Sequence, residues 1–347
     1  MSDAEMTRIW SESGADRLTE ALPDGLSVGN GIPDVDTVLK TVSGEGVLSR
    51  LWESVLSEGG GAIRLTGRLC GVLVLFAVWT RYRQTVRHDT NDLFSHAVAL
   101  VSALIGFRAL AQLFADTADY FTQLHTAVTA ALTTLTALAA MRGAVQTAAV
   151  GSMGMALFLA VMETVCSGVL FPFLRVCTGL SLASSVGGGD ALSQISAFLR
   201  RQFLFLIGAV MMLLCAVLSY QSVLARAADS VTMRAVKFTL SGAVPIIGGA
   251  VGEAASAVAA GFALTQKTVG VLGIAAILWQ ILPTVCSVCL TRTAFSVSGA
   301  LASFLGMKRE AGILSECASL AGFLLAVCIA AAVLYILMLT LCMNGGG

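Results

Sequence analysis

Long apolar runs separated by short polar stretches fill the chain from Ala62 to Met343. The runs are continuously apolar and do not alternate with polar residues, which argues against strands. About 20 apolar residues in helical form cross a bilayer core of roughly 30 Å, and hydrocarbon cannot hydrogen-bond an open backbone. The pattern therefore predicts an all-α fold, a polytopic bundle of about eight transmembrane helices. The predicted spans are 62–80, 95–114, 121–141, 147–174, 203–225, 243–264, 268–290 and 318–343.

Polar and helix-breaking residues add detail to these spans. Asp116 and Asp119 predict an acidic turn between the second and third spans. The third span is rich in Thr and Ala, which suits a helix–helix interface or a water-lined path better than lipid contact. Pro172 predicts a kink or break in the fourth span, and Pro283 breaks the seventh. Residues 191–202 form an amphipathic helix before the fifth span, and residues 291–317 are amphipathic before the eighth.

Composition agrees with a membrane protein, because only 12% of the residues are charged and 56% are hydrophobic, whereas a soluble domain has about 25% charged residues. The charge is unevenly placed. Residues 1–61 hold eleven acidic and four basic residues, a net charge of −7. We predict an acidic extracytoplasmic segment at 1–61, with a surface-lying amphipathic stretch at Val47–Leu56, a membrane domain at 62–343 and a flexible tail at 344–347.

Lys and Arg near span ends favour the cytoplasmic side. Placing Arg81–Arg87 there puts the acidic segment outside, and eight crossings then put the C-terminus outside as well. Seven crossings would result if 243–264 only re-enters the membrane. In the eight-span arrangement Arg200 and Arg201 fall on the wrong side. The other basic stretches expected on the cytoplasmic side are Arg142, Arg226–Lys237 and Arg292–Arg309.

The first ten residues have no basic start followed by an apolar run, as a signal peptide would. Two alternatives follow: a leader has been removed, or the first span directs insertion itself.

The most specific stretch is ADSVTMRAVKF at Ala228–Phe238, followed by VPIIGG at Val244–Gly249. It joins a charged cytoplasmic segment to a span opened by glycine and proline. Such a span is either a broken helix lining a transport site or an ordinary packed helix entry. The candidate functional residues here are Asp229, Arg234, Lys237, Pro245, Gly248, Gly249 and Glu253.

These two motifs resemble the signature of the stage III sporulation protein AE family of endospore-forming bacteria. MRGAVQT at Met141–Thr147 and KTVG at Lys267–Gly270 fit the same family. The resemblance covers most of Phe94–Met343, and the chain before Ala62 adds nothing to it.

The resemblance implies a role in the mother cell–forespore apparatus, a transenvelope channel that has been compared with specialised secretion systems. It implies placement in the mother-cell membrane around the forespore. The implied partners are the other stage III A-operon proteins, among them an ATPase and ring subunits, and the stage II protein Q complex. No catalytic residue set is attached to the family. Abundant Gly and Ala faces also allow a homo-oligomer.

Ionisable residues inside predicted spans are the remaining candidates. Arg108, Glu163 and Glu253 lie there, and a charge at membrane depth costs at least about 2.5–3.5 kcal/mol on insertion scales. Each should face a partner, a cavity or water. Arg108 with Glu163 or Glu253 is a possible pair, and we expect Glu253 to face a polar path or a subunit contact.

Other functions fit less well. A secondary transporter for a small solute is the main alternative, although no internal repeat is evident. An intramembrane enzyme lacks a catalytic cluster, and no phosphate-binding loop for ATP is present. No basic stripe suits nucleic acid. Cys286 and Cys289 are spaced as C-x-x-C, but a zinc site needs two more ligands, so core packing is favoured and we expect no cofactor.

Overall fold

The computed structural model describes residues 44–84, 91–141, 145–187, 194–203 and 248–344, with part of the stretch between 205 and 227. Within these ranges the chain is helical and contains no strand, as predicted. The elements are α4 (Gly44–Gln84), α5 (Asn91–Met141), α6 (Val145–Glu163), the π-helix η1 (Thr164–Leu170), α7 (Phe171–Gly187), α9 (Gly248–Phe304) and α10 (Lys308–Asn344).

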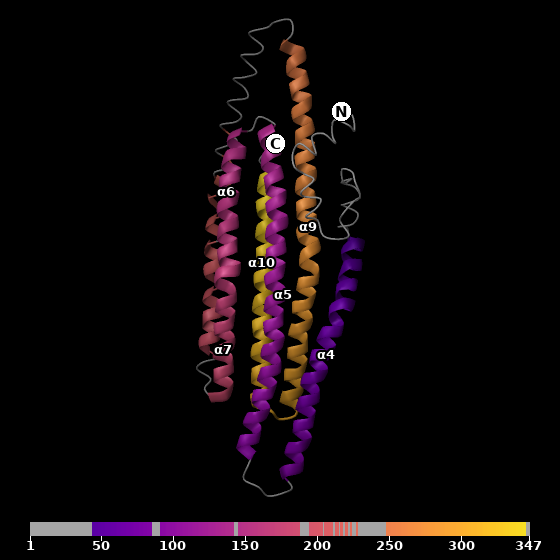
Figure 1. Ribbon diagram of the computed structural model, residues 1–347, viewed down its shortest axis with the longest axis vertical. Helices are drawn as coiled ribbons and strands as arrows, with labels where there is room; N and C mark the ends of the chain where they lie inside the picture. The colour runs from indigo at the N-terminus through magenta and orange to yellow at the C-terminus, as the bar shows by residue number, and fades with distance from the viewer. Residues whose placement is uncertain are drawn as a thin grey trace.

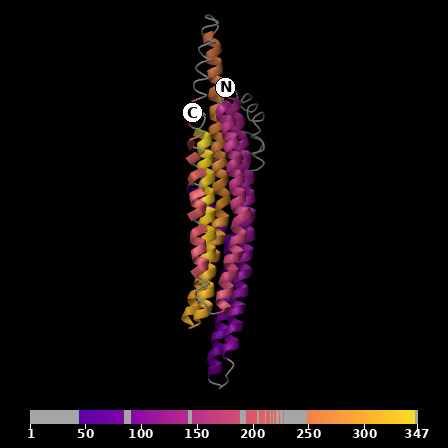
Figure 2. The same cartoon turned by 90° about the vertical axis from the view of Figure 1, so that its left-hand side faces the viewer.

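The helices lie side by side in one long, narrow bundle (Figures 1 and 2). α5 has 51 residues and α9 has 57. At 1.5 Å per residue they are roughly 75 and 85 Å long, more than twice the thickness of a bilayer core. Only part of each helix can therefore lie in the hydrocarbon of one membrane.

α9 is the central element, because it packs against α4, α5 and α10. α5 in turn packs against α6, α7 and α10. The first turns of α9 extend past the other described helices at one end of the bundle (Figure 1). The buried apolar core is continuous along α5, α9 and α10.

A tight turn at Leu305–Met307 joins α9 to α10. The Met307 N–H donates to the Ala302 carbonyl (2.9 Å), and the Gly306 N–H donates to the Ser303 carbonyl (3.0 Å). This is a Schellman motif, which needs a left-handed residue after the helix. Gly306 supplies it with φ = 81°. The turn divides the segment at 291–317, which was predicted to be amphipathic, between α9 and α10.

The Thr- and Ala-rich part of α5 forms a helix–helix interface, as predicted. Leu124, Val128 and Leu135 are fully buried there. Threonine hydroxyls donate to carbonyls one turn earlier, for example Thr126 to Thr122 at 2.9 Å. Such bonds satisfy the hydroxyl within its own helix and allow close packing in an apolar setting.

Gly273 marks a close approach of α9 to two of its neighbours. A Cβ at this position would lie 3.1 Å from Leu339 Cδ1 on α10 and 3.2 Å from Ala131 Cβ on α5. Only a residue without a side chain allows the three helices to meet here.

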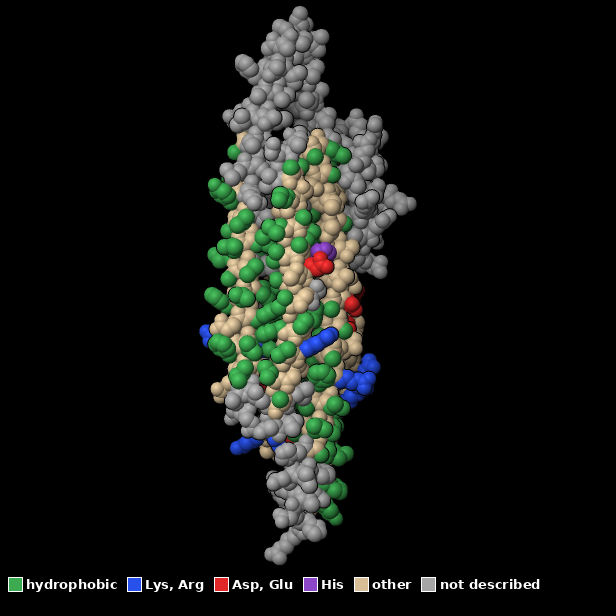
Figure 3. All heavy atoms as spheres, turned by 60° about the vertical axis from the view of Figure 1, so that its left-hand side comes forward, with side chains coloured by type: hydrophobic (Ala, Val, Ile, Leu, Met, Phe, Trp, Pro, Cys, Tyr) green, Lys and Arg blue, Asp and Glu red, His purple; other side chains and the backbone are tan. Residues whose placement is uncertain are grey.

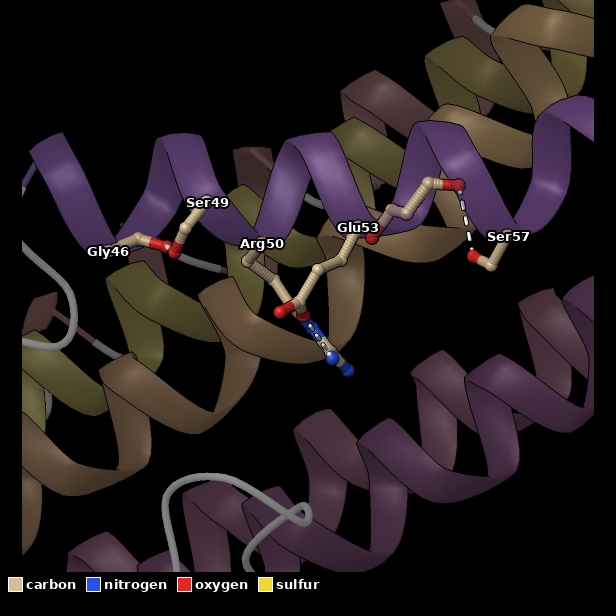
Figure 4. Close-up of polar contacts among 6 residues, drawn as sticks. Gly46, Ser49, Arg50, Glu53 and Ser57 are labelled. Atoms are coloured by element: carbon tan, nitrogen blue, oxygen red, sulfur yellow. Dashed lines mark hydrogen bonds and ion pairs between the residues drawn. The ribbon is translucent and has the colours of Figure 1, made fainter.

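The first turns of α4 carry a polar face (Figure 4). Ser49 donates to the Gly46 carbonyl (2.9 Å), and Arg50 lies 3.6 Å from Glu53. The Arg50 guanidinium also lies 5.0 Å from the centre of the Trp279 ring on α9. The expected helix at Val47–Leu56 is confirmed, but it is part of α4, which continues without a break through Ala62.

Six helices in the described part of the chain are long and apolar enough to cross a membrane. The predicted count of about eight is therefore not confirmed. The six candidate spans are Gly46–Trp79, Ala97–Met141, Ser152–Leu180, Gln194–Leu214, Thr265–Phe304 and Lys308–Thr340.

The predicted turn at Asp116 and Asp119 is wrong. Both residues lie on the exposed surface of α5, which runs unbroken from Asn91 to Met141. Neither Gly nor Pro occurs nearby to end a helix, and Asp116 accepts a hydrogen bond from Gln112 one turn earlier (2.8 Å). The spans predicted at 243–264 and 268–290 are likewise parts of one helix, α9, over the described residues.

The break predicted in the fourth span is present, but its cause differs. The chain changes to π-helix at Thr164–Leu170, and Pro172 follows as the second residue of α7. Proline is tolerated in a first helical turn. Pro283 lies inside α9 without ending it, so the predicted break of the seventh span is wrong.

The predicted sidedness also changes. α5 is a single straight run, so Met141 lies at the opposite end of the bundle from Gln84 and Asn91 (Figure 1). The prediction placed the basic residues next to both ends on the same cytoplasmic side, and a helix with no turn at Asp116 cannot do so.

Candidate functional site

Charged side chains gather around the middle of the bundle. Arg64 and Arg68 of α4 line one cavity with Arg108 of α5. Phe107, the neighbour of Arg108, lines a second cavity with Arg175 of α7. Figure 3 shows basic side chains in the lower half of one face, with a histidine and acidic groups above them among apolar side chains.

Contacts of α10 place further residues at about the same height along the bundle as Arg108. Gly106 of α5 faces Cys317 of α10, whose Sγ would lie 3.1 Å from an added Cβ. The Arg292 guanidinium carbon would lie 3.2 Å from a Cβ on Gly322. We call this group the arginine belt; its members are Arg64, Arg68, Arg108, Arg175, Arg200 and Arg292.

 The first cavity, here called the arginine cavity, lies between α4, α5 and α9. The volume of the arginine cavity is about 520 Å³. Small residues leave this space open, because Gly61, Ala62 and Ser287 form part of its wall. The polar groups that face it are Glu58, Arg64, Arg68, Arg108, Gln112, Asp116, Ser287 and Thr291.

The second cavity, here called the mixed-charge cavity, has a volume of about 560 Å³ and lies between α5, α6, α7 and α10. His125, Glu163 and Arg175 line it together with aromatic side chains such as Phe121 and Tyr335. The Nδ1 atom of His125 is buried and has no hydrogen-bond partner among the described residues. Small-molecule sites are mostly apolar cavities of about 300–1,000 Å³ with a few polar groups, and this cavity has both properties.

The π-helix η1 determines which residues face the mixed-charge cavity. Glu163 and Arg175 are twelve residues apart, so in an uninterrupted α-helix they would point about 120° away from each other. A π-helical segment has more residues per turn and rotates α7 relative to α6. Both residues line the cavity as a result. They are separated by roughly 18 Å along the helix axis, which is too far for a direct ion pair.

Among the described residues, Arg200 is the member of the arginine belt that forms an ion pair. Its guanidinium donates to Glu316 Oε2 of α10 at 3.0 Å. The Arg200 side chain is 7% exposed and that of Glu316 is 27% exposed. Arg200 was difficult to place by charge counting, and the structure explains why: it faces the interior of the bundle, where a carboxylate pairs with it.

Several predicted site residues lie outside the described residues. These are Asp229, Arg234, Lys237 and Pro245. Gly248, Gly249 and Glu253 lie in the first turns of α9, but the structure does not describe their side chains. Their proposed roles stay predictions.

The predicted pairing of Arg108 with Glu253 is wrong within one chain. Arg108 lines the arginine cavity with Ser287 of α9. Glu253 precedes Ser287 by 34 residues on the same helix, which corresponds to roughly 50 Å. Arg108 and Glu163 line different cavities, so the structure does not bring them together in one site.

Sequence reasoning missed three features of this region. Arg64 and Arg68 are one helical turn apart and so share a face, but they were not among the candidate residues. Arg175 had no signal, because the π-helix that turns it into the cavity cannot be read from residue spacing. Glu316 is 116 residues from its partner Arg200, and nothing local connects them.

The cysteines behave as packing residues where they are described. Cys286 is buried and Cys289 is partly buried, and both are free thiols. Within the described ranges, no three His, Cys, Asp or Glu side chains are grouped so as to hold a metal ion.

The part of the chain that the structure describes holds six helices long and apolar enough to cross a membrane, which indicates a helical membrane protein. Its family is shown by a match to the stage III sporulation protein AE family over residues 34–346, and the chain belongs to that family. The match begins before Ala62, so the expectation that this early part of the chain adds nothing to the resemblance is wrong. No curated protein and no solved structure gives a significant match to the chain.

Proposed function

We propose that this chain is a membrane subunit of the mother cell–forespore transenvelope complex, a channel or secretion-like assembly required during endospore formation. The family match over residues 34–346 carries the proposal. We place the protein in the mother-cell membrane around the forespore as a multi-pass subunit without enzymatic activity. Its partners in this proposal are the other stage III A-operon proteins, including the ATPase and ring subunits, and the stage II protein Q complex.

The grouping of arginines supports a role in assembly or passage. Arg200 is buried, whereas the other five members of the arginine belt are exposed within candidate membrane spans. A charge at membrane depth costs several kcal/mol unless it is compensated, so these exposed arginines call for a polar partner or a polar path. The arginine belt and the two cavities at its level suit contacts with polar partners or a polar path.

The test is isolation of the tagged full chain in mild detergent from sporulating cells, followed by identification of the associated proteins. We expect the stage III A-operon proteins to co-isolate and the mass to exceed that of one chain. A solitary chain, isolated under conditions that preserve other sporulation complexes, would refute the proposal.

The Glu253→Gln variant tests the predicted role of that residue in the same experiment. We expect weaker association of partners and fewer spores. Lys267→Gln is a matched control, because Lys267 is an exposed charged residue on the same helix. Normal assembly and sporulation of Glu253→Gln would remove Glu253 from the proposed site.

A secondary transporter for a small solute remains the second candidate. The mixed-charge cavity favours it, because about 560 Å³ lined by His125, Glu163 and Arg175 suits a small polar solute. Purified protein in liposomes distinguishes the two functions. Solute uptake that Glu163→Gln abolishes would support the transporter, whereas uptake unchanged by that substitution, or none, would count against it.

A further inference from the structure

The arginine cavity carries more positive than negative charge. Arg64, Arg68 and Arg108 face it, against Glu58 and Asp116. No ion pair or hydrogen bond joins Arg68 or Arg108 to another described residue, and the Arg64 Nε–H donates only to the Gly60 carbonyl of its own helix (3.0 Å). The guanidinium groups therefore leave most of their donors available to a ligand.

The charges in the cavity are separated along the bundle. α4 and α5 run in opposite directions (Figure 1). On α4, Arg64 and Arg68 lie nearer than Glu58 to the end formed by Gln84 and Asn91. On α5, Arg108 is likewise nearer to that end than Asp116. One end of the cavity is thus basic, and the acidic groups lie roughly 9–15 Å away from the arginines along the helix axes.

Exposed guanidinium groups that line a cavity are well suited to phosphate oxygens. Arg forms paired hydrogen bonds to phosphate, with a fixed fork geometry that Lys lacks. Basic pockets between membrane helices are a recurrent form of lipid headgroup site. The cavity volume of about 520 Å³ accommodates a headgroup, and Ser287 and Thr291 add hydroxyl groups to its wall.

An exposed apolar strip continues from the basic end of the cavity. Leu104 lines the cavity and is 68% exposed. Leu100, one turn further toward Asn91 on α5, is 55% exposed, and Leu75 of α4, two turns beyond Arg68, is 66% exposed. An apolar strip does not contribute to binding a soluble anion, whereas the acyl chains of a lipid would pack against it.

We propose that the arginine cavity binds the phosphate-bearing headgroup of a membrane phospholipid. Arg64, Arg68 and Arg108 hold the phosphate, and the acyl chains follow the strip formed by Leu75, Leu100 and Leu104 toward the Gln84–Asn91 end. Bound lipid would join α4 to α5 and α9 at this level. The inference does not depend on the secretion-like function.

The experiment uses the full chain, purified in detergent and depleted of lipid. Wild-type protein is titrated with phosphatidylglycerol, with a diacylglycerol glycolipid that lacks phosphate, and with inorganic phosphate, and bound lipid is counted by native mass spectrometry. We expect phosphatidylglycerol to bind at least tenfold more tightly than either of the others. Equal retention of the glycolipid would overturn the proposal, and equally tight binding of inorganic phosphate would replace the lipid with a soluble anion.

Variants then locate the site. Arg68→Gln combined with Arg108→Gln should lower the affinity for phosphatidylglycerol at least tenfold. Arg201→Gln is the matched control, because Arg201 is exposed and does not line the cavity. Unchanged affinity in the double variant would overturn the assignment. If the double variant does not fold, the wild-type comparison of lipids still decides the question.

Discussion

Arg200 and the arginines of the arginine cavity lie at one level of the same bundle but are compensated in different ways. Arg200 is buried and its charge is balanced by Glu316 of α10 at 3.0 Å. Arg68 and Arg108 face a cavity, with no ion pair to another described residue. In the first arrangement the counter-charge comes from the chain itself, whereas the second calls for an anion from outside. The difference separates a structural charge from a candidate binding group.

The two arrangements also differ in how they respond to substitution. Breaking a buried ion pair leaves an uncompensated charge, which costs far more than the pair itself contributes. An exposed arginine that faces solvent or a ligand contributes little to folding by itself. Stability should therefore depend on Arg200 and Glu316, and ligand binding on Arg64, Arg68 and Arg108.

The largest effect is expected for Glu316→Gln. The substitution leaves Arg200 buried without a counter-charge, which should lower the free energy of unfolding by about 3–5 kcal/mol. Thermal unfolding in detergent measures the loss. The double variant Arg200→Met with Glu316→Leu should recover most of it, because apolar residues often replace a buried pair at little cost. A single variant as stable as wild type would show that the pair is not the compensation we infer.

The second-largest loss of stability is expected at Gly273, in the packed core between α5, α9 and α10. Gly273→Leu inserts a side chain where a Cβ would already lie 3.1 Å from Leu339 and 3.2 Å from Ala131. Overpacking should cost about 1–3 kcal/mol, measured by the same unfolding assay. Gly312→Leu is the control, because it gains the same helix propensity but has no atom within 4 Å of an added Cβ. Equal stability of the two variants would contradict the packing.

A smaller effect is expected for Arg50→Gln. The Arg50 guanidinium lies 5.0 Å from the Trp279 ring centre, where it joins α4 to α9. Loss of this cation–π contact should lower stability by about 0.5–1 kcal/mol. In a double-mutant cycle with Trp279→Leu, the loss of stability in the double variant should be smaller than the sum of the two single losses. Fully additive losses would show that the two residues do not interact.

The smallest effect is expected for Arg68→Gln in lipid-free detergent. Its side chain is exposed and has no ion pair with a described residue, so unfolding should change by no more than about 0.5 kcal/mol. With phosphatidylglycerol present, the wild type should be stabilised more than the variant, because a ligand stabilises the state that it binds. A large loss without lipid would mean that Arg68 is structural like Arg200.

Much of this fold follows from local chemistry. Continuous apolar runs predict helices, and the Thr- and Ala-rich stretch of α5 predicts close helix packing. A kink or break was predicted in the fourth span, where the structure changes to π-helix after Glu163, but the change of helix type itself was not predicted. The C-x-x-C cysteines were correctly read as packing residues, since Cys286 is buried.

The candidate site was less predictable, because its residues come from distant segments. Arg108 was identified as a charge inside a predicted span, but it is exposed in the structure, and its neighbours Arg64 and Arg68 come from another helix. Span boundaries were also predicted wrongly where one long helix, α5 or α9, covers two predicted spans. Asp116 and Asp119 suit an exposed helix surface as well as a turn, and only their neighbours in space distinguish the two.

The amino-acid sequence by itself determined that the chain is helical, apolar enough for a membrane and a member of its sporulation family, because these depend on composition, periodicity and local motifs. The tertiary structure alone decided which polar interruptions are turns, which arginines have a carboxylate partner and which face a cavity. The physical reason is that the energy of a charge at depth depends on what surrounds it in space, and those surroundings come from helices more than a hundred residues apart.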